Sequence, residues 1–171
     1  METKSRIIEE YKKLVKEKKT ADITVAEICR NAGISRTTFY SYFHDRYEIT
    51  ETIMLDEIEG PLLKALHAGF ARSEVIRIIF ESFLYDKDFY KIAIMEDCQN
   101  SLYESLIESL TKIISENDKS KEKQMLSSKE REYVDYRFAA DTVFTIKKWM
   151  MGGMAESPEF MSKVYIYPKF E

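Results

Sequence analysis

The sequence predicts an all-α fold, and three observations indicate it. Glycine and proline, which end helices and form turns, supply only five and three of the 171 residues. Apolar residues recur at three- and four-residue intervals along most of the chain, which is the periodicity of one helix face. Ser, Thr or Asp precedes several of these runs, where its side chain can accept hydrogen bonds from the first free amides of a helix. With 44% hydrophobic residues, such helices can bury a substantial core.

The first expected helix covers residues 4–18. Its apolar stripe predicts the buried face, formed by Ile7, Ile8, Tyr11, Leu14 and Val15. Lys12, Lys13 and Lys16 lie off that stripe, and we interpret them as a solvated helix face rather than as DNA contacts. Lys4 and Arg6, near the start of the helix, could contact phosphates.

A helix-turn-helix is predicted between Thr24 and Ile49. Thr24 and Glu27 have the spacing of a capping box, in which each side chain bonds the backbone amide of the other residue. Gly33 suits the left-handed residue at a helix end, and Ser35 can then cap the next helix. A further capping box is expected where Asp45 and Glu48 begin a longer helix.

The rest of the chain keeps the helical period. We expect Gly60-Pro61 to interrupt or kink the helix that starts after Asp45, and residues 115–132 to form a mobile loop or the exposed start of the next helix. Gly152-Gly153 should close a helix that contains Trp149, and Ser157 with Pro158 should begin a last short one. We place the domain boundary at residue 46, with a DNA-binding domain over 1–46 and a helical regulatory and dimerisation domain over 47–171.

The charge of −4 is unevenly distributed. Residues 1–48 contain ten Lys and Arg against eight Asp and Glu, whereas the remainder contains sixteen against twenty-two. Only the N-terminal part can therefore face phosphates favourably.

Several classes of protein are disfavoured. The charged N-terminus lacks the apolar segment of a secretory signal, and no apolar run approaches the roughly 20 residues that cross a bilayer. Cys29 reads as a small buried hydrophobe and Cys98 as inert, while His44 and His67 have no nearby ligand cluster. We therefore expect a cytoplasmic protein with no membrane partner, no metal and no cofactor.

The second helix of the helix-turn-helix shows a division between an inner and an outer face. Phe39 and Phe43 are four residues apart and can anchor it inward. The residues left facing outward, within reach of base edges and phosphates, are Arg36, Thr37, Tyr40 and Ser41.

The run ITVAEICRNAGISRTTFYSYFHDRYEI resembles the DNA-binding region of the TetR family of bacterial regulators, over roughly residues 5–50. The motif consists of Gly33-Ile34-Ser35, Phe39-Tyr40, Tyr42-Phe43 and Asp45-Arg46. By position, the resemblance implies phosphate contacts from Thr24, Ser35, Tyr40, Tyr42 and Arg46, and base contacts from Arg36 and Thr37. Many members have another residue at Tyr42 and Lys at Arg46, so the geometry next to the fourth helix can differ. The run WMMGGMAESPE is similar to a C-terminal segment of some members, including activators.

The predicted function is that of a homodimeric transcriptional regulator on a roughly palindromic operator, a repressor released by a small-molecule inducer. The alternative is an activator or co-activator whose C-terminal body binds a protein partner and has no inducer pocket. An enzyme with a DNA-binding head is disfavoured, since the sequence contains no nucleophile–base pair, phosphate loop or metal triad.

Overall fold

The protein is all-α, as the sequence predicts. A computed structural model describes residues 2–95, 102–118 and 120–165, and these residues form helices and no strand. In chain order the elements are α1 (Thr3–Glu17), η1 (Thr20–Asp22), α2 (Val25–Ala32), α3 (Arg36–Tyr40), α4 (Tyr47–Met54), η2 (Leu55–Glu59), α5 (Gly60–His67), α6 (Arg72–Leu84), α7 (Lys87–Met95), α8 (Leu102–Asn117), α9 (Lys121–Gln124), α10 (Ser128–Met151) and α11 (Pro158–Tyr165). None of the helices in these ranges is both long and apolar enough to cross a membrane.

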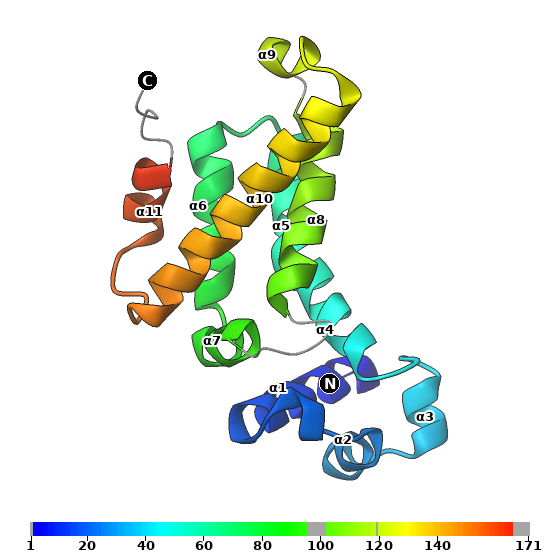
Figure 1. Cartoon of the computed structure of the whole chain (residues 1–171). Helices are drawn as coiled ribbons and strands as arrows, with labels where there is room; N and C mark the ends of the chain where they lie inside the picture. Colours follow the sequence, from blue (N-terminus) through cyan, green and yellow to red (C-terminus); the bar gives the residue numbers. More distant parts are fainter. Residues whose placement is uncertain (1, 96–101, 119, 166–171) are drawn as a thin grey trace.

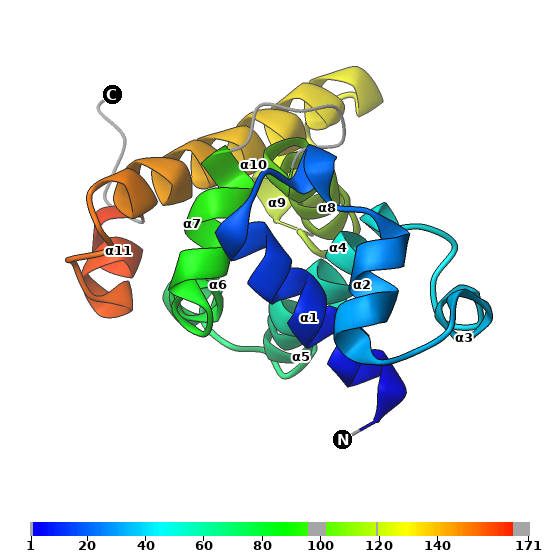
Figure 2. The ribbon, with the colours of Figure 1, turned by 90° about the horizontal axis from the view of Figure 1, so that it is seen from below.

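The helices form two groups joined by one rising helix (Figure 1). We call α1–α3 the head and α5–α11 the body; α4 and η2 connect them. Within the body, α10 packs along α8, and α11 packs on α6. Seen from below, α3 lies at the edge of the head, away from the body helices (Figure 2). The arrangement leaves α3 accessible while α1 faces the body.

The core of the head follows the predicted apolar stripe. Ile7, Tyr11, Leu14 and Val15 are buried on α1, within a helix that matches the expected one to within a residue at each end. The Tyr11 hydroxyl lies 2.9 Å from Oγ1 of Thr50 on α4. Because the start of α4 contacts α1, the head and the connecting helix share a core. The boundary at residue 46 stays a prediction.

Gly60-Pro61 does not interrupt the helix, so the first of the two expected effects, interruption or a kink, is wrong. The chain passes from α4 through η2, a π-helical turn, directly into α5. Proline has no N–H and its ring crowds the preceding turn of an α-helix, and a wider turn can absorb both effects. The amide of Gly60 bonds the carbonyl of Leu55, and a Cβ at Gly60 would lie 3.0 Å from that oxygen. The widened turn contains Glu57.

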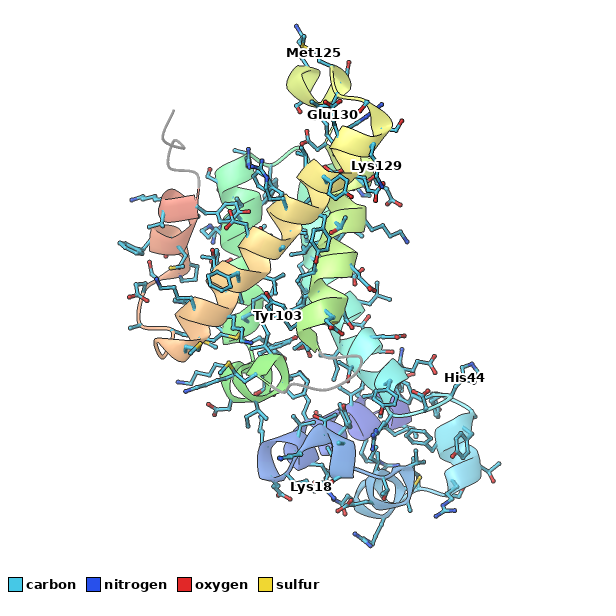
Figure 3. The ribbon with its side chains drawn as sticks, viewed as in Figure 1. Lys18, His44, Tyr103, Met125, Lys129 and Glu130 are labelled. Atoms are coloured by element: carbon cyan, nitrogen blue, oxygen red, sulfur yellow. The ribbon has the colours of Figure 1, made fainter. Side chains whose placement is uncertain are left out.

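The polar stretch 115–132 is mostly helical. It contains the end of α8, the short helix α9 and the exposed start of α10, of which only the last was expected. Ser127 and Glu130 form a capping box: Ser127 Oγ accepts the amide of Glu130 at 3.3 Å, and Glu130 Oε2 accepts the amide of Ser127 at 2.7 Å. Hydrogen bonds from the side chain and the backbone amide of Ser127 to the carboxylate lower the pKa of Glu130. In Figure 3, Met125 and Glu130 mark this end of the body, opposite the head.

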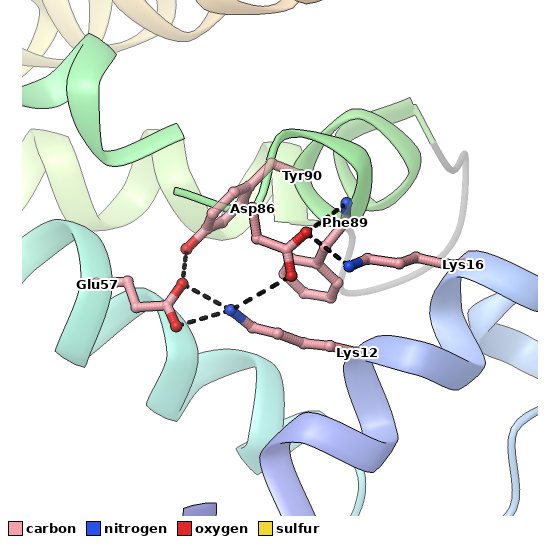
Figure 4. A network of polar contacts seen from close by, with 6 residues as sticks. All are labelled: Lys12, Lys16, Glu57, Asp86, Phe89 and Tyr90. Atoms are coloured by element: carbon pink, nitrogen blue, oxygen red, sulfur yellow. Dashed lines mark hydrogen bonds and ion pairs between the residues drawn. The ribbon is translucent and has the colours of Figure 1, made fainter. Parts of the chain in front are cut away.

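The interpretation of Lys12 as a solvated residue is wrong. Lys12 is only 7% exposed, and its Nζ lies 2.7 and 2.8 Å from the two carboxylate oxygens of Glu57. Asp86, between α6 and α7, lies 3.9 Å from the same ammonium and 2.7 Å from Nζ of Lys16 (Figure 4). Tyr90 on α7 donates to Glu57 Oε2 at 2.6 Å. We call these five residues the junction network, because they join the head to η2 and the body.

The surroundings of the junction network explain why Lys12 can be buried. A buried charge is tolerated only when it is paired and hydrogen-bonded, and Lys12 has both forms of compensation. Its ammonium also lies 5.0 Å from the ring centroid of Phe89. Burial, and secondarily the Glu57 carboxylate, raises the pKa of Tyr90, so the phenol stays protonated and donates.

Replacing Lys12 by Met should lower the free energy of unfolding by about 2–4 kcal/mol, because Glu57 and Asp86 would lose their shared cation in a largely dehydrated site. Lys13→Met is the matched control, since Lys13 is exposed and, among the residues that the structure describes, forms its ion pair with Glu10 on its own helix. It should change stability by about 0.5 kcal/mol or less. Urea unfolding followed by circular dichroism measures the free energy of unfolding of both variants. If the two variants lose equal stability, the junction network does not contribute as proposed.

Candidate nucleic-acid interface

The helix α2 begins at Thr24, as predicted. Thr24 Oγ1 accepts the amide of Glu27 at 3.3 Å. The Glu27 carboxylate bonds the ammonium of Lys18. That hydrogen bond, and more weakly one from the backbone of Thr24, lowers the pKa of Glu27. The Thr24 cap is therefore confirmed, and a cation from the end of α1 shares the carboxylate that was expected to bond Thr24 alone.

The turn after α2 has the predicted glycine geometry. Gly33 adopts φ 64° and ψ 39°, a left-handed conformation that costs glycine little. The amide of Ile34 then bonds the carbonyl of Cys29 at 3.0 Å, which closes the helix end. Cys29 is buried, as expected, and burial raises the pKa of its thiol. This tight turn fixes where α3 starts relative to α2.

The short helix α3 is held by one cap and two phenylalanines. Ser35 Oγ accepts the amide of Thr38 at 3.0 Å, which confirms it as the N-cap. Phe39 and Phe43 are 0% and 2% exposed, and their ring centroids lie 5.9 Å apart. Both phenylalanines are confirmed as core residues. They anchor α3 to the head from its inner side.

The opposite side of α3 is open. The predicted contact residues Arg36, Thr37, Tyr40, Ser41 and Tyr42 are all exposed, with Tyr40 54% exposed. The Tyr40 ring packs edge-on against Phe39, with the ring centroids 5.5 Å apart. This contact holds the ring in place while more than half of the residue stays exposed. Thr24 and Ser35 are exposed as well. Seven of the eight predicted residues are thus exposed, six of them between Ser35 and Tyr42 and the seventh, Thr24, at the start of α2. Their contacts with DNA stay a prediction.

The entry into α4 is capped one residue away from the expected pattern. Asp45 Oδ1 accepts the amides of Tyr47 and Glu48, at 2.7 and 3.0 Å. The Glu48 carboxylate accepts the amide of His44 at 2.5 Å, and not that of Asp45. The Asp45 half of the expected capping box is therefore present, while the Glu48 carboxylate bonds the amide one residue before the expected one. Figure 3 shows His44 at this corner, beside α3.

Arg46 is the eighth predicted residue, and its side chain bonds within the protein. Its Nη1 donates to the carbonyl of Ala21 at 2.9 Å and to that of Ile23, while Nη2 donates to the Tyr47 hydroxyl at 2.9 Å. The guanidinium also stacks on the Tyr47 ring, 4.8 Å from its centroid. Sequence reasoning missed this role, because backbone carbonyls more than twenty positions away leave no signal in the sequence. Arg46 ties the start of α4 to the segment before α2.

A cavity of about 540 Å³ lies in the body, between α5, α6, α8 and α10. Its volume is within the range of about 300–1,000 Å³ that is typical of small-molecule sites. No group of three or more His, Cys, Asp or Glu residues in the described ranges could hold a metal ion. Cys98 lies outside the described residues.

Arg46→Ala should lower the free energy of unfolding by about 1–2 kcal/mol, because three acceptors lose a charged hydrogen-bond donor. Arg36→Ala removes the same charge from an exposed position and should change stability by about 0.5 kcal/mol or less. Thermal or urea unfolding of the two variants compares them directly. A larger loss for Arg36→Ala would contradict the positioning role of Arg46.

Comparisons with known proteins agree with this architecture. A family model described as "Transcriptional regulator C-terminal region", from the TetR group, matches residues 72–166. The transcriptional regulator EthR of Mycolicibacterium smegmatis is 39% identical over 64 residues, which are 37% of this chain. The match spans only 27% of the length of EthR.

Solved structures share the fold at low identity. A TetR-family transcriptional regulator from Syntrophomonas wolfei has a TM-score of 0.74 at 16% identity, over 95% of this chain and 90% of that one. FadR of Thermus thermophilus, a repressor solved with lauroyl-CoA, has a TM-score of 0.61 at 17% identity, over 98% and 96% of the two chains. Because the family model covers more than half of the sequence, the chain belongs to the TetR family of transcriptional regulators.

Proposed function

We propose that the protein binds a specific DNA sequence as a homodimer and regulates transcription in the cytoplasm, without acting as an enzyme. The observation that carries the proposal is the two-sided construction of α3. Phe39 and Phe43 fix its inner side, while Arg36, Thr37 and Tyr40 stand exposed on its outer side. A helix with small and hydrogen-bonding groups on an exposed face is what entry into a major groove requires.

The proposed contacts divide into two kinds. Arg36 and Thr37, at the start of α3, would reach base edges, and an arginine pairs best with guanine. Phosphates would be bound by Thr24, Ser35, Tyr40 and Tyr42, with Ser41 beside them. For Arg46 we propose that it acts mainly by fixing the start of α4, since its donors are engaged with Ala21, Ile23 and Tyr47.

Two heads would have to bind together, because one head has little excess positive charge. Contacts between Lys or Arg and phosphates supply most of the non-specific affinity of DNA-binding proteins. Lys and Arg exceed Asp and Glu by only two over residues 1–48, so one head can form few such contacts. We therefore expect binding to depend on paired half-sites about one helical turn, or a multiple of it, apart. A mobility-shift titration on fragments from the protein's own promoter region tests this. Tighter binding to a palindromic fragment supports the proposal, and equal binding to random DNA at moderate salt overturns it.

The longest helix offers a surface for the second copy. Tyr133, Tyr136, Phe144 and Met151 are between 54% and 64% exposed on α10, and their spacing places them on one side of the helix. Buried residues such as Ile146 lie on its other side. An exposed apolar stripe of this length is typical of a subunit interface. We propose that the two α10 stripes face each other in the dimer.

Phe144→Glu should weaken dimerisation at least about tenfold, because it would bury a carboxylate at the proposed interface. Leu55→Glu is the control: Leu55 is also apolar and half-exposed, at 53%, but lies on η2. Light scattering after size-exclusion chromatography, over a range of concentrations, gives the masses. A dimer that withstands Phe144→Glu would exclude this interface.

The body cavity favours a repressor with a small-molecule inducer. The alternative, an activator whose body binds a protein partner, would give this cavity no role. In the neighbouring FadR structure the bound ligand is lauroyl-CoA. Ligand binding would release DNA by changing how the two heads are spaced, if the ligand prefers one spacing.

Arg36→Ala should relax sequence preference at one base pair of each half-site, by about 1–3 kcal/mol of discrimination. Tyr40→Phe should weaken binding to every sequence about threefold to tenfold, because it removes one hydroxyl that bonds a phosphate. Competition binding with operators changed at each position distinguishes the two. The opposite pattern would show that the two roles are assigned the wrong way round.

A further inference from the structure

We propose that the body cavity binds an amphiphile with an aliphatic chain and one anionic end, such as a medium-chain carboxylate. The proposal rests on the proposed function, because it names the chemical class of the inducer. It follows from the apolar walls of the cavity, from the charges at its edge and from how the acidic residues around it are already engaged.

The walls of the cavity are aliphatic. They are formed from α5, α6 and α8 by Leu62, Leu66, Val75, Ile76, Ile79, Leu110 and Ile113. Branched aliphatic side chains offer dispersion contacts and no hydrogen bonds, so they suit a flexible hydrocarbon chain. Burying such a chain removes apolar surface from water at both the ligand and the wall.

The edge of the cavity provides positive charge. Arg72, the first residue of α6, stacks on Phe138 with its guanidinium 4.5 Å from the ring centroid. Arg137, on α10, lines the same cavity and is exposed, as is Arg72. In the part of the chain that the structure describes, neither guanidinium forms an ion pair. Both can therefore receive an anion from a ligand.

The acidic residues that line the cavity cancel only part of this charge. Asp135 is buried and lies 2.7 Å from the ammonium of Lys123, which also donates to the carbonyl of Ile114 at 3.1 Å. This pair is neutral as a unit. Asp118 accepts the amide of Ser120 at 3.0 Å within its own turn and keeps its negative charge. Two arginines against this one carboxylate leave the lining with a net positive charge.

Tyr165 adds a neutral donor next to Arg72. Its hydroxyl is hydrogen-bonded to Thr142 and donates to the carbonyl of Phe138 at 3.3 Å. Burial raises the pKa of Tyr165, and the nearby Asp141 carboxylate adds to that shift, while the hydrogen bond with Thr142 and the charge of Arg72 oppose it in part. The phenol therefore stays protonated at neutral pH, and a bound carboxylate would have to take over the hydrogen that the carbonyl of Phe138 accepts. Arg72 and Tyr165 together form an anion-binding corner beside the aliphatic walls.

This arrangement predicts an order of ligands. A carboxylate gains charge-assisted hydrogen bonds at the corner, an alcohol of the same chain length gains only neutral ones, and a quaternary ammonium is repelled. Isothermal titration of the full-length protein with decanoate, decan-1-ol and decyltrimethylammonium tests the order. Decanoate should bind at least about tenfold more tightly than the alcohol, because hydrogen bonds to charged groups are the stronger ones. Equal affinities would overturn the proposal.

The corner and the walls are tested separately. Arg72→Gln should weaken decanoate binding about tenfold and leave decan-1-ol unchanged. Arg131→Gln is the control, since Arg131 is exposed on α10 and does not line the cavity. From hexanoate to decanoate, each added CH₂ should increase affinity about threefold to fourfold. An equal effect of Arg72→Gln on both ligands, or no dependence on chain length, would overturn the assignment.

DNA binding is measured separately from ligand binding, so the two proposals can fail independently. The mobility-shift titration without ligand tests the proposed function, whatever the cavity binds. If operator binding is present and none of the three amphiphiles binds, the ligand class is wrong and the regulator stands. If decanoate binds with the predicted pattern and the palindrome is not preferred, the ligand class stands and the proposed function fails.

Discussion

The burial of the Lys12 ammonium is the constraint on which the arrangement of head and body depends. Taking an ammonium out of water is costly, and its partners must lie in one place to offset that cost. Glu57 holds it at 2.7 Å, and Tyr90 fixes Glu57 in turn. Glu57 lies on η2 and Tyr90 on α7 (Figure 4). The Lys12 ammonium therefore reaches its partners only when α1 packs in one position against the body. A purely apolar contact would allow more sliding.

The same helix connects this junction to the cavity. Glu57 lies on η2, and Leu62, one of the cavity walls, lies on α5, which continues η2 without a break. A ligand that displaces α5 would therefore move Glu57 and strain its pairing with Lys12. The continuous helical segment from η2 to α5 and the ion pair between Glu57 and Lys12 form a contiguous physical route from the proposed inducer site to α1. The cavity and the DNA-facing helix need no direct contact.

Local signals were predictable from the sequence, whereas long-range polar contacts were not. Gly33, Ser35, Phe39 and Phe43 behave as predicted, because a turn, a cap and a four-residue spacing are decided within a few positions. Lys12 was misread because its partner Glu57 is 45 positions away, and the donors of Arg46 meet backbone atoms that any residue provides. The passage through Gly60-Pro61 was missed because the rule for proline assumes an α-helical turn, and this turn is π-helical. Arg36, Thr37, Tyr40 and Ser41, which the helical spacing places outward, are exposed, and their contacts with DNA stay a prediction.

The junction network should make head and body one cooperative unit. Native-state hydrogen exchange at increasing denaturant tests it most directly, by comparing buried amides of α1 with those of α8. We expect the amides of both helices to exchange through the same opening, with equal free energies and equal denaturant dependence. If α1 exchanges through a separate opening of much lower free energy while α8 remains protected, the head is an independent unit and the claim is contradicted.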